Sequence, residues 1–348
     1  MAVLSKNWPS REGFTADVLG KLISRTILSP WKVLPLLALL QHTIKGREFI
    51  ETRPTLLKIL RALAALSLLN RINAWLDHRA INNGQKDHYD WNREVILLTG
   101  GSGGIGRHIA EMFGQRGIKV AILDITPPAA EPVLPSSVRY FECDITSPSA
   151  IKETAHAIRA SFGKPTILIN NAGILTGKTI LGTTESTTRR MFDVNTLSHY
   201  WLAQEFLPDI IAANHGMIVT VASQAGYTVT PNMVDYSASK AAAIAFHEGL
   251  AAELVTRYDA GRVRSVLVTQ GFTRTGLIGC LTPEDTWFNP LLYPESVAEG
   301  IVGQVLKGES GRVVVPGSAG YLCHRLRGYP LWIQHGLRCR LERLVRAE

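Results

Sequence analysis

Seven short apolar runs alternate with helix-spaced segments between residues 95 and 315, and this alternation restricts the fold more than any other feature. The runs are rich in Val and Ile, and they lie at 95–98, 119–123, 138–141, 166–169, 217–221, 263–268 and 313–315. The helical segments between them are 105–115, 149–162, 185–213, 233–257 and 296–306. Runs that are apolar on both faces are typical of parallel strands covered on each side by helices. The pattern predicts an α/β fold with a doubly wound parallel sheet of about seven strands.

A glycine-rich turn, Thr99-Gly-Gly-Ser-Gly-Gly-Ile-Gly106, joins the first run to the first helical segment. Glycines let the backbone turn tightly and approach a pyrophosphate, whose charge then lies at the free N–H groups of the helix N-terminus. The turn therefore predicts a Rossmann-like dinucleotide site that includes Thr99, Gly100, Ser102, Gly104, Ile105 and Gly106.

Asp124 ends the second run, 18 residues after Gly106. A carboxylate at this position accepts hydrogen bonds from the ribose hydroxyls of an adenosine and repels a 2′-phosphate. Neither Gly103 nor Ile125 is basic, so neither would compensate such a phosphate. Asp124 therefore favours NAD as the cofactor, with NADP as the alternative.

Tyr236 and Lys240 are four residues apart near the start of a helical segment, so they share one face of that helix. A neighbouring ammonium stabilises tyrosinate and lowers the pKa of a phenol, which suits a general acid/base at neutral pH. Ser223 follows the fifth run, and open α/β sheets bind their ligands at the carboxyl ends of the strands. These three residues are candidate catalytic residues.

With further motifs, these residues make the chain similar to the short-chain dehydrogenase/reductase family over about residues 93–318. In chain order, the matching residues are the turn at 99–106, Cys143-Asp144-Ile145, Asn170-Asn171-Ala172-Gly173, Asn195, Ser223, Tyr236 and Lys240. The N-terminal extension, Asp124 and the segment 194–201 resemble the membrane-attached retinol and 17-beta-hydroxysteroid dehydrogenase branch of that family.

The resemblance implies a role for each matched residue. Tyr236 would exchange a proton with the substrate oxygen, Ser223 would hold that oxygen, and Lys240 would bind the nicotinamide ribose and tune Tyr236. Asn195 would hold a water in a proton relay. The remaining implied contacts are with the adenine, from Asp144 and Ile145, and with the rest of the cofactor and the sheet, from Asn171, Ala172 and Gly173. Hydride transfer itself would belong to the nicotinamide.

The sequence departs from the family pattern after the sixth run, where Gln270-Gly271 stands in place of the usual Pro-Gly. The loss of a proline adds freedom to the loop that follows. That loop, 272–277, resembles the family's nicotinamide-contacting loop. Gly271, Thr273 and Thr275 are therefore expected cofactor contacts.

The segment 277–292 falls where the family places its substrate lid. It contains the apolar residues Leu277, Ile278, Leu281, Trp287, Phe288, Leu291 and Leu292. An apolar lid beside an apolar N-terminal extension predicts a lipophilic alcohol or ketone as the substrate. The alternative is that these side chains only fill the core. His199 and His247 are expected to be core or surface residues rather than acid/base groups.

The net charge of +8 lies mostly at the two ends of the chain, whereas the middle is slightly acidic. Basic ends without interleaved aromatic residues argue against nucleic acid as a partner. Cys143, Cys280, Cys323 and Cys339 form no C-x-x-C or zinc pattern, so no metal site is expected.

The apolar stretches 27–40 and 62–69 are shorter than the roughly 20 residues that span a bilayer. Trp31, Trp75 and flanking Lys and Arg residues favour an interfacial or hairpin anchor. The alternative is a pair of helices packed on the protein itself or on a second subunit of a homodimer. At the C-terminus, a helical face of Ile333, Leu337, Leu341 and Leu344 predicts either a membrane-surface helix or a docked or oligomer-forming tail.

We therefore expect three regions: a helical, apolar and basic extension at 1–88, an NAD-binding domain at 89–318, and a basic amphipathic tail at 319–348. The first twenty residues do not have the apolar core of a signal peptide. A cytosol-facing membrane surface is the expected location, on the endoplasmic reticulum or a lipid droplet if the source is eukaryotic. A cytoplasmic location is the alternative.

The leading functional prediction is an NAD-dependent dehydrogenase. It would transfer a hydride between the nicotinamide and a lipophilic alcohol or carbonyl of retinoid, steroid or long-chain type, with Tyr236 as the general acid/base. One alternative is an NADPH-dependent carbonyl reductase of a biosynthetic pathway. Another is a membrane-tethered protein that binds NAD without turnover.

Overall fold

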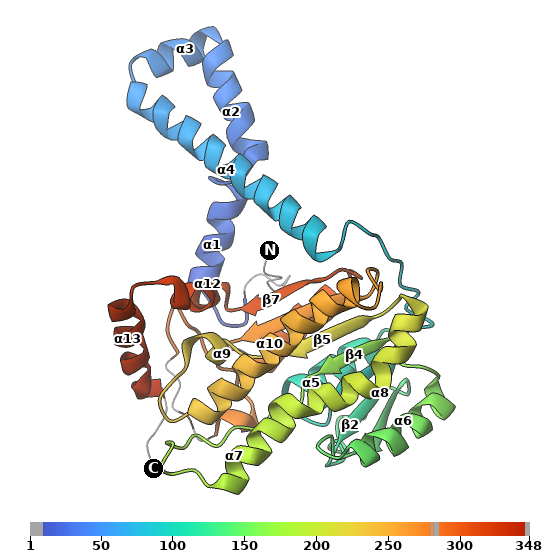
Figure 1. Cartoon of the computed structure of the whole chain (residues 1–348). Helices are drawn as coiled ribbons and strands as arrows, with labels where there is room; N and C mark the ends of the chain where they lie inside the picture. Colours follow the sequence, from blue (N-terminus) through green and yellow to red (C-terminus); the bar gives the residue numbers. More distant parts are fainter. Residues whose placement is uncertain (1–9, 280, 282–284, 345–348) are drawn as a thin grey trace.

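A seven-stranded parallel sheet lies at the centre of the computed structural model, which describes residues 10–279, 281 and 285–344 (Figure 1). The strands are β1 Val95–Thr99, β2 Lys119–Asp124, β3 Val138–Glu142, β4 Ile167–Asn170, β5 Met217–Val221, β6 Arg264–Gln270 and β7 Gly311–Val315. In space they follow the order β3-β2-β1-β4-β5-β6-β7, and every neighbouring pair is parallel. The predicted doubly wound sheet is confirmed.

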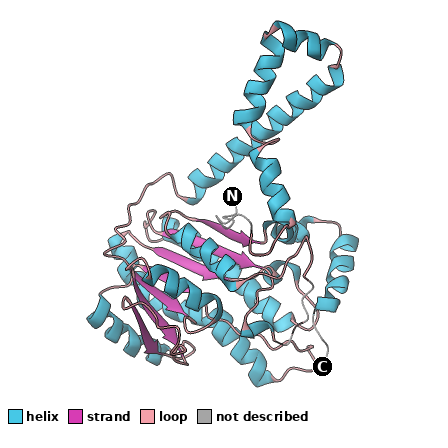
Figure 2. Cartoon of the chain, turned by 180° about the vertical axis from the view of Figure 1, so that it is seen from behind, coloured by secondary structure: helices cyan, strands magenta, loops and turns pink. Residues whose placement is uncertain are grey.

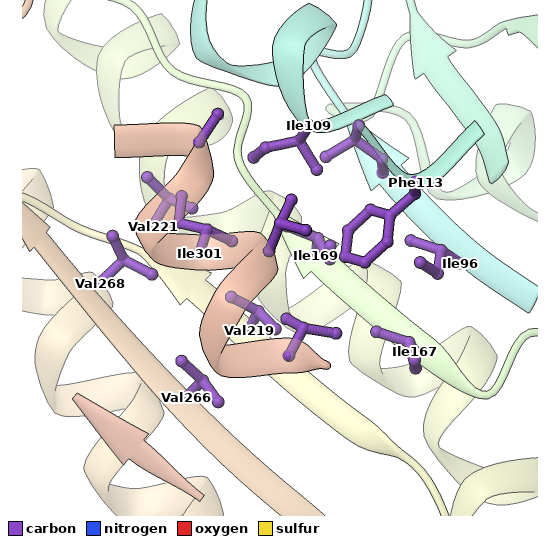
Figure 3. Packing of buried hydrophobic residues seen from close by; sticks show 14 of the residues in the cluster. Ile96, Ile109, Phe113, Ile167, Ile169, Val219, Val221, Val266, Val268 and Ile301 are labelled. Carbon is purple, nitrogen blue, oxygen red and sulfur yellow. The ribbon is translucent and has the colours of Figure 1, made fainter. Parts of the chain in front are cut away.

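Helices cover both faces of the sheet. One face packs on α5 (Gly104–Gly114) and α11 (Pro294–Val305), and the other on α6 (Pro148–Phe162), α8 (Ser198–Ala213) and α10 (Val234–Thr256). Successive strand residues point to opposite faces, so Ile96 lies in one core cluster with Phe113 and Ile301 (Figure 3), whereas Leu97 lies in the other with Phe206. Each fully buried side chain of this kind contributes roughly 1.5–3 kcal/mol.

The order of the strands reverses between β1 and β4. The chain runs outward from β1 through β2 to β3, then crosses back to β4 and continues outward to β7. Loops that follow the carboxyl ends of β1 and β4 therefore leave in opposite directions. This reversal opens a crevice above the sheet, which is where open α/β sheets bind their ligands.

The predicted helix 185–213 is not continuous. It consists of α7 (Glu185–Phe192), a π-helical segment η1 (Asp193–Leu197) and α8. The wider π-helical turn contains Asn195, whose side chain is fully buried and bonded to a neighbouring loop. The remaining short elements are α9 (Ala225–Thr228), α12 (Gly317–Arg325), α13 (Leu331–Arg340) and the 3₁₀ turns η2 (Gly276–Ile278), η3 (Leu326–Gly328) and η4 (Leu341–Leu344).

The N-terminal extension is helical and projects from the body of the protein (Figures 1 and 2). Helix α1 (Ala16–Arg25) leaves the body, and α2 (Pro30–His42), α3 (Ile44–Glu51) and α4 (Pro54–Ile81) form the part that we call the projecting hairpin, residues 30–81. Among the described residues, no single helix has the length and apolar composition of a membrane span. Helices α1 and α2, which meet at a bend of 46°, satisfy that test only as a pair.

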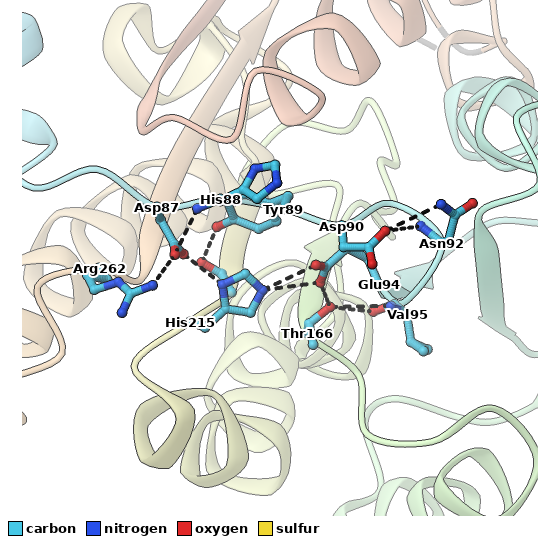
Figure 4. A network of polar contacts seen from close by, with 11 residues as sticks. Asp87, His88, Tyr89, Asp90, Asn92, Glu94, Val95, Thr166, His215 and Arg262 are labelled. Atoms are coloured by element: carbon cyan, nitrogen blue, oxygen red, sulfur yellow. Dashed lines mark hydrogen bonds and ion pairs between the residues drawn. The ribbon is translucent and has the colours of Figure 1, made fainter.

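The segment after α4, residues 82–94, is hydrogen-bonded to residues near the amino ends of the strands (Figure 4). The side chain of Asp87 is shielded from solvent and accepts hydrogen bonds from Arg262 Nη2 and His215 Nδ1, each at 2.7 Å. His215 Nε2 lies 3.2 Å from Glu94 Oε1. The buried Arg264 guanidinium donates to the backbone carbonyls of Asn82 and Gln85 at 3.0 and 2.8 Å. These contacts join the hairpin to the body at its C-terminal end.

The C-terminal tail docks on the body, which is one of the predicted arrangements. Leu337 and Leu341 are half-buried and line a cavity described below, and Arg338 Nε donates to the carbonyl of Thr228 at 3.1 Å. Ile333 is also half-buried, whereas the side chain of Leu344 lies outside the described residues.

Candidate active site

The glycine turn is shaped by close backbone packing. A Cβ at Gly106 would lie 2.0 Å from the carbonyl oxygen of Gly100, and one at Gly100 would lie 2.8 Å from Cα of Ala172. Gly100 and Gly104 have positive φ angles of 65° and 51°, which a residue with a side chain adopts only under strain. A Cβ at Gly103 would contact nothing within 4 Å, so that face of the turn is open to a ligand.

A cleft of about 530 Å³ extends from this turn across the carboxyl ends of the strands. Most of the predicted cofactor residues line it: Gly100, Ser102, Gly104, Ile105, Asp124, Asp144, Ile145, Asn171, Ala172, Gly173, Tyr236, Lys240 and Thr275. Thr99 and Gly106 lie behind the cleft, where Thr99 Oγ1 accepts from the N–H groups of Asn171 and Ala172, both at 3.0 Å. Gly271 and Thr273 line the neighbouring apolar cavity instead.

Asp124 lies on the wall of the cleft beside the glycine turn. Its Oδ2 accepts from the backbone N–H of Ser102 at 3.1 Å, and its Oδ1 accepts from that of Thr126 at 3.3 Å. These bonds fix the direction of the carboxylate. Among the described residues that line the cleft, the basic side chains are Arg190 and Lys240, and Arg190 had no signal in the sequence. Asp144 has a lowered pKa because the backbone N–H of Thr146 binds its carboxylate.

Tyr236 lines the cleft, and both Tyr236 and Ser223 line the neighbouring apolar cavity. Tyr236 is only 6% exposed, and its side chain is hydrogen-bonded to that of Ser223. Burial raises the pKa of Tyr236 to about 12, against the opposing effect of this hydrogen bond. The expected lowering of the phenol pKa by Lys240 is not found in this structure.

Lys240 is bonded to the backbone at the end of β5. Its Nζ donates to the carbonyl of Val221 at 2.9 Å and lies 5.9 Å from the centroid of the Tyr236 ring. Burial lowers the pKa of Lys240 to about 8, so a neutral amine is accessible near physiological pH.

Asn195 connects the π-helical segment to the loop after β4 and to α10. Its Oδ1 accepts from the backbone N–H of Ile174 at 2.8 Å, and its Nδ2 donates to the carbonyl of Ile174 and to Ser239 Oγ, both at 3.0 Å. A Cβ at Gly173 would lie 3.3 Å from both Asn195 Oδ1 and Lys240 Nζ. Glycine at 173 therefore leaves open the space between these two polar groups.

A second, apolar cavity of about 230 Å³ adjoins the cleft and shares Ile105, Tyr236, Gln270, Thr275 and Leu277 with it. Ser223 lines this cavity. Its apolar wall consists of Leu175, Ala225, Met233, Phe272, Ile278, Leu281, Phe288, Ala319, Leu322, Leu337 and Leu341. Leu175 was not recognised in the sequence as a cavity residue, because an apolar residue in a loop is not distinguishable there from a core residue.

The predicted lid contributes only part of its apolar residues to this cavity. Leu277, Ile278, Leu281 and Phe288 line the cavity. Trp287 is 49% exposed and lies outside the lining, and Leu292 belongs to the core under the sheet. Residues 280 and 282–284 lie outside the described part of the lid.

Gln270, which departs from the family pattern, is held by backbone bonds on both sides. Its carbonyl accepts from the N–H of Gln224 at 3.0 Å, and the next residue, Gly271, donates to the carbonyl of Val315 at 2.7 Å. These bonds restrict the loop start without a proline. The Oε1 atom of Gln270 is buried and has no hydrogen-bond partner among the described residues.

His199 and His247 are core residues, as expected. Burial lowers the pKa of His199 to about 3 and that of His247 to about 4, so both rings are neutral at pH 7. Neither lines the cleft or the apolar cavity. Within residues 10–279, 281 and 285–344, no group of three or more His, Cys, Asp or Glu side chains has the arrangement of a metal site.

Comparison with known proteins agrees with this geometry. The short chain dehydrogenase family profile matches residues 94–285, more than half of the chain. Dehydrogenase RED2 of Cochliobolus heterostrophus is 43% identical over 201 residues, which cover 58% of this chain and 76% of that protein.

Two similar relatives are named for lipid substrates. Estradiol 17-beta-dehydrogenase 11 of Rattus norvegicus is 33% identical over 243 residues, 68% of this chain and 80% of that protein. Epidermal retinol dehydrogenase 2 of Mus musculus is 32% identical over 249 residues, 69% of this chain and 79% of that protein. The chain therefore belongs to the short-chain dehydrogenase family, in the branch that includes these relatives, and it is an NAD(P)-dependent oxidoreductase.

Proposed function

We propose that this enzyme is an NAD-preferring dehydrogenase that interconverts lipophilic alcohols and the corresponding ketones or aldehydes. The observation that carries the proposal is the junction of the two cavities. Tyr236 lines both the cleft with the glycine turn and the apolar cavity, so its hydroxyl faces the place where a cofactor and a substrate would meet.

The cleft fits a nicotinamide dinucleotide. The tightly packed turn at Gly100 and Gly106 and the open face at Gly103 suit a pyrophosphate. Asp124 is oriented to accept hydrogen bonds from the ribose of the adenosine, Asp144 and Ile145 would contact the adenine, and Lys240 would bind the second ribose. When bound, the nicotinamide would accept or donate the hydride.

Tyr236 would exchange the proton. In alcohol oxidation its hydroxyl group would take up the proton of the substrate hydroxyl, and in carbonyl reduction it would return that proton. Ser223, which is bonded to Tyr236, would hold the substrate oxygen. Asn195 Oδ1 retains a second lone pair, through which it would hold a relay water in the space beside Gly173 and Lys240.

The walls of the apolar cavity favour a hydrocarbon substrate. Most of its lining side chains are aliphatic or aromatic, and its polar lining residues include Ser223 and Tyr236. A cavity of this kind binds a ring system or an acyl chain by burying apolar surface while a few polar groups fix its orientation. The relatives named for estradiol and retinol support this substrate class.

The projecting hairpin would hold the enzyme at a membrane surface that faces the cytosol. Many of its large apolar side chains are exposed, among them Trp31 at 80%, Ile44 at 80% and Leu69 at 63%. Lys and Arg residues lie between them along α2 to α4. Exposed apolar side chains with flanking cations are typical of segments that enter the headgroup region of a bilayer. The alternative occupant of this surface is the same hairpin of a second copy.

The substrate class is tested by measuring turnover of matched alcohols with NAD and with NADP. We expect retinol, estradiol and long-chain alcohols to be oxidised with NAD, and ethanol and sugar alcohols to be poor substrates. Preference for NADPH with efficient reduction of carbonyls would favour the carbonyl reductase instead. Binding of NAD without turnover of any of these alcohols or carbonyls would favour a non-catalytic role.

The proposed membrane location of the enzyme is tested by its flotation with liposomes that contain anionic lipids. A variant with Leu36→Asp, Leu39→Asp and Leu69→Asp should remain in the bottom fraction while the wild type floats. The control carries Ile180→Asp and Leu181→Asp, two exposed apolar residues on the body. Equal flotation of all three proteins would contradict the hairpin as the anchor, and a wild type that dimerises and does not float would favour a second copy.

A further inference from the structure

Helix α1, which precedes the projecting hairpin, contacts α12, the helix that leads into the C-terminal tail. Asp17, in the first turn of α1, accepts hydrogen bonds at Oδ2 from the N–H of Gly317 at 2.8 Å and at Oδ1 from the N–H of Ser318 at 2.7 Å. These are the first two N–H groups of α12. The N-cap residue of α12 is Pro316, whose side chain cannot accept a hydrogen bond. Asp17 therefore caps a helix that lies 300 residues away in the sequence.

Helix α12 is one wall of the apolar cavity. Ala319, Leu322 and Cys323 line that cavity. On its other side, α12 packs so closely on β7 that a Cβ at Gly320 would lie 2.2 Å from Val314. Gln224, the residue after Ser223, donates from Nε2 to the carbonyl of Pro316 at 3.1 Å. The start of α12 is thus bonded to Asp17 on one side and to the active-site loop on the other.

The lid residues 287–288, the second of which forms another part of the cavity wall, are bonded to the same two segments, α1 and the start of α12. The backbone N–H of Ala16 donates to the carbonyl of Trp287 at 2.9 Å, and Ser318 Oγ donates to the carbonyl of Phe288 at 2.8 Å. Phe288 lines the cavity. Residues 16–17 therefore hold α12 and the lid residues 287–288 next to each other.

We propose that Asp17 is a positioning residue for the substrate cavity. Its carboxylate satisfies two N–H groups that α12 leaves without an intrahelical partner and interacts favourably with the positive end of the helix dipole. By fixing α12 beside residues 287–288, it sets the width of the cavity for a lipophilic substrate. This inference rests on the proposed function for the kind of substrate, and it makes α1 the connection between the projecting hairpin and the cavity.

The test compares Asp17→Asn and Asp17→Ala with a control in the same segment. The control is Arg11→Gln, which breaks the ion pair with Glu299 on α11 and leaves α12 untouched. For a retinol substrate we expect Asp17→Ala to raise KM about tenfold, as for the loss of a strong helix cap. Asp17→Asn, which keeps one acceptor, should give an intermediate value. The values of kcat and of KM for NAD should stay within about twofold of wild type, since nothing in the cleft changes.

Hydrogen exchange supplies a readout that does not need turnover. The amides of 317–325 and 286–289 should exchange faster in Asp17→Ala and unchanged in Arg11→Gln. Unchanged exchange in Asp17→Ala would overturn the proposal, and so would faster exchange with an unchanged KM. If the wild type turns over no lipophilic alcohol, the proposed function fails, and retinol binding measured by its fluorescence replaces KM. Equal retinol affinity in wild type and Asp17→Ala would then overturn the role of Asp17.

Discussion

Lys240 Nζ and the carbonyl oxygen of Val221 are 2.9 Å apart, joined by a hydrogen bond at the carboxyl end of strand β5. The same Nζ lies over the ring of Tyr236, 5.9 Å from the ring centroid. Burial dominates the titration of Tyr236 and raises its pKa to about 12. The phenol is neutral at pH 7, and it is ready to donate a proton but must lose one to accept another.

This protonation state predicts different pH dependences for the two directions. Between pH 6 and 9, we expect kcat/KM for alcohol oxidation to rise by up to tenfold per pH unit, because the base form of Tyr236 becomes more populated. Carbonyl reduction should stay nearly level over the same range, since the acid form persists up to its pKa. Steady-state rates in both directions check this. A plateau of oxidation below pH 7 would show that Tyr236 titrates at a lower pH than the geometry implies.

Asp124 should control the choice of cofactor. In Asp124→Ser we expect KM for NAD to rise about tenfold and KM for NADP to fall, because the ribose loses an acceptor and a 2′-phosphate no longer meets a negative charge. Asp209→Asn is the matched control, since Asp209 binds Lys164 and Arg159 away from the cleft. An unchanged ratio of the two KM values in Asp124→Ser would contradict the role of this carboxylate.

The apolar wall should control the choice of substrate. Leu281 is 8% exposed and lines the cavity, so Leu281→Arg would place a charge in an apolar space. We expect KM for retinol to rise by at least about tenfold while KM for NAD stays unchanged. Leu181→Arg, at a residue that is 97% exposed, is the control. A similar loss with both variants would point to a general effect on the protein.

The Asp87 network should make the enzyme sensitive to acid. Burial raises the pKa of Asp87, but hydrogen bonds from Arg262 and His215 outweigh that effect, and the net pKa is lowered. A carboxyl whose pKa is lower in the folded state stabilises the fold above its unfolded pKa of 3.8 and loses that contribution as the pH falls through its folded pKa.

Urea unfolding at pH 7 and at pH 3 tests this. At pH 7 we expect Asp87→Asn to be less stable than wild type by about 2–4 kcal/mol, because Arg262 and His215 lose a shielded partner. At pH 3 the difference should narrow. Asp90→Asn is the control, since Asp90 is exposed and its carboxylate bonds locally to Asn92. A difference that is the same at both pH values would contradict the lowered pKa.

The sheet and the cofactor cleft were predictable because their signals are local. Each strand is a short apolar run, and the glycine turn and Asp124 follow directly from strands that lie side by side. Parallel strands place their carboxyl ends at one edge of the sheet. Residues such as Gly100, Asp124 and Asn171 therefore meet there, independently of the conformations of the loops.

The parts that were not predictable depend on contacts between distant segments. The break in the helix 185–213 reflects the bonds of Asn195 to Ile174, which no helical periodicity reveals. The raised pKa of Tyr236 depends on its burial in the folded protein. The capping of α12 by Asp17 joins residues 300 positions apart. The spacing of Leu337 and Leu341 predicts that they share one face of a helix, but it does not predict which surface that face contacts.

The most direct test of the proposed proton transfer by Tyr236 is the rate of NADH formation from retinol by the Tyr236→Phe variant. The matched control is Tyr227→Phe, because Tyr227 is a neighbouring tyrosine on α9 that lines neither the cleft nor the cavity. We expect Tyr236→Phe to lose about 10²- to 10⁴-fold in kcat with NAD affinity unchanged, and Tyr227→Phe to retain near wild-type turnover. Wild-type turnover in Tyr236→Phe would contradict a mechanism in which this tyrosine exchanges the proton.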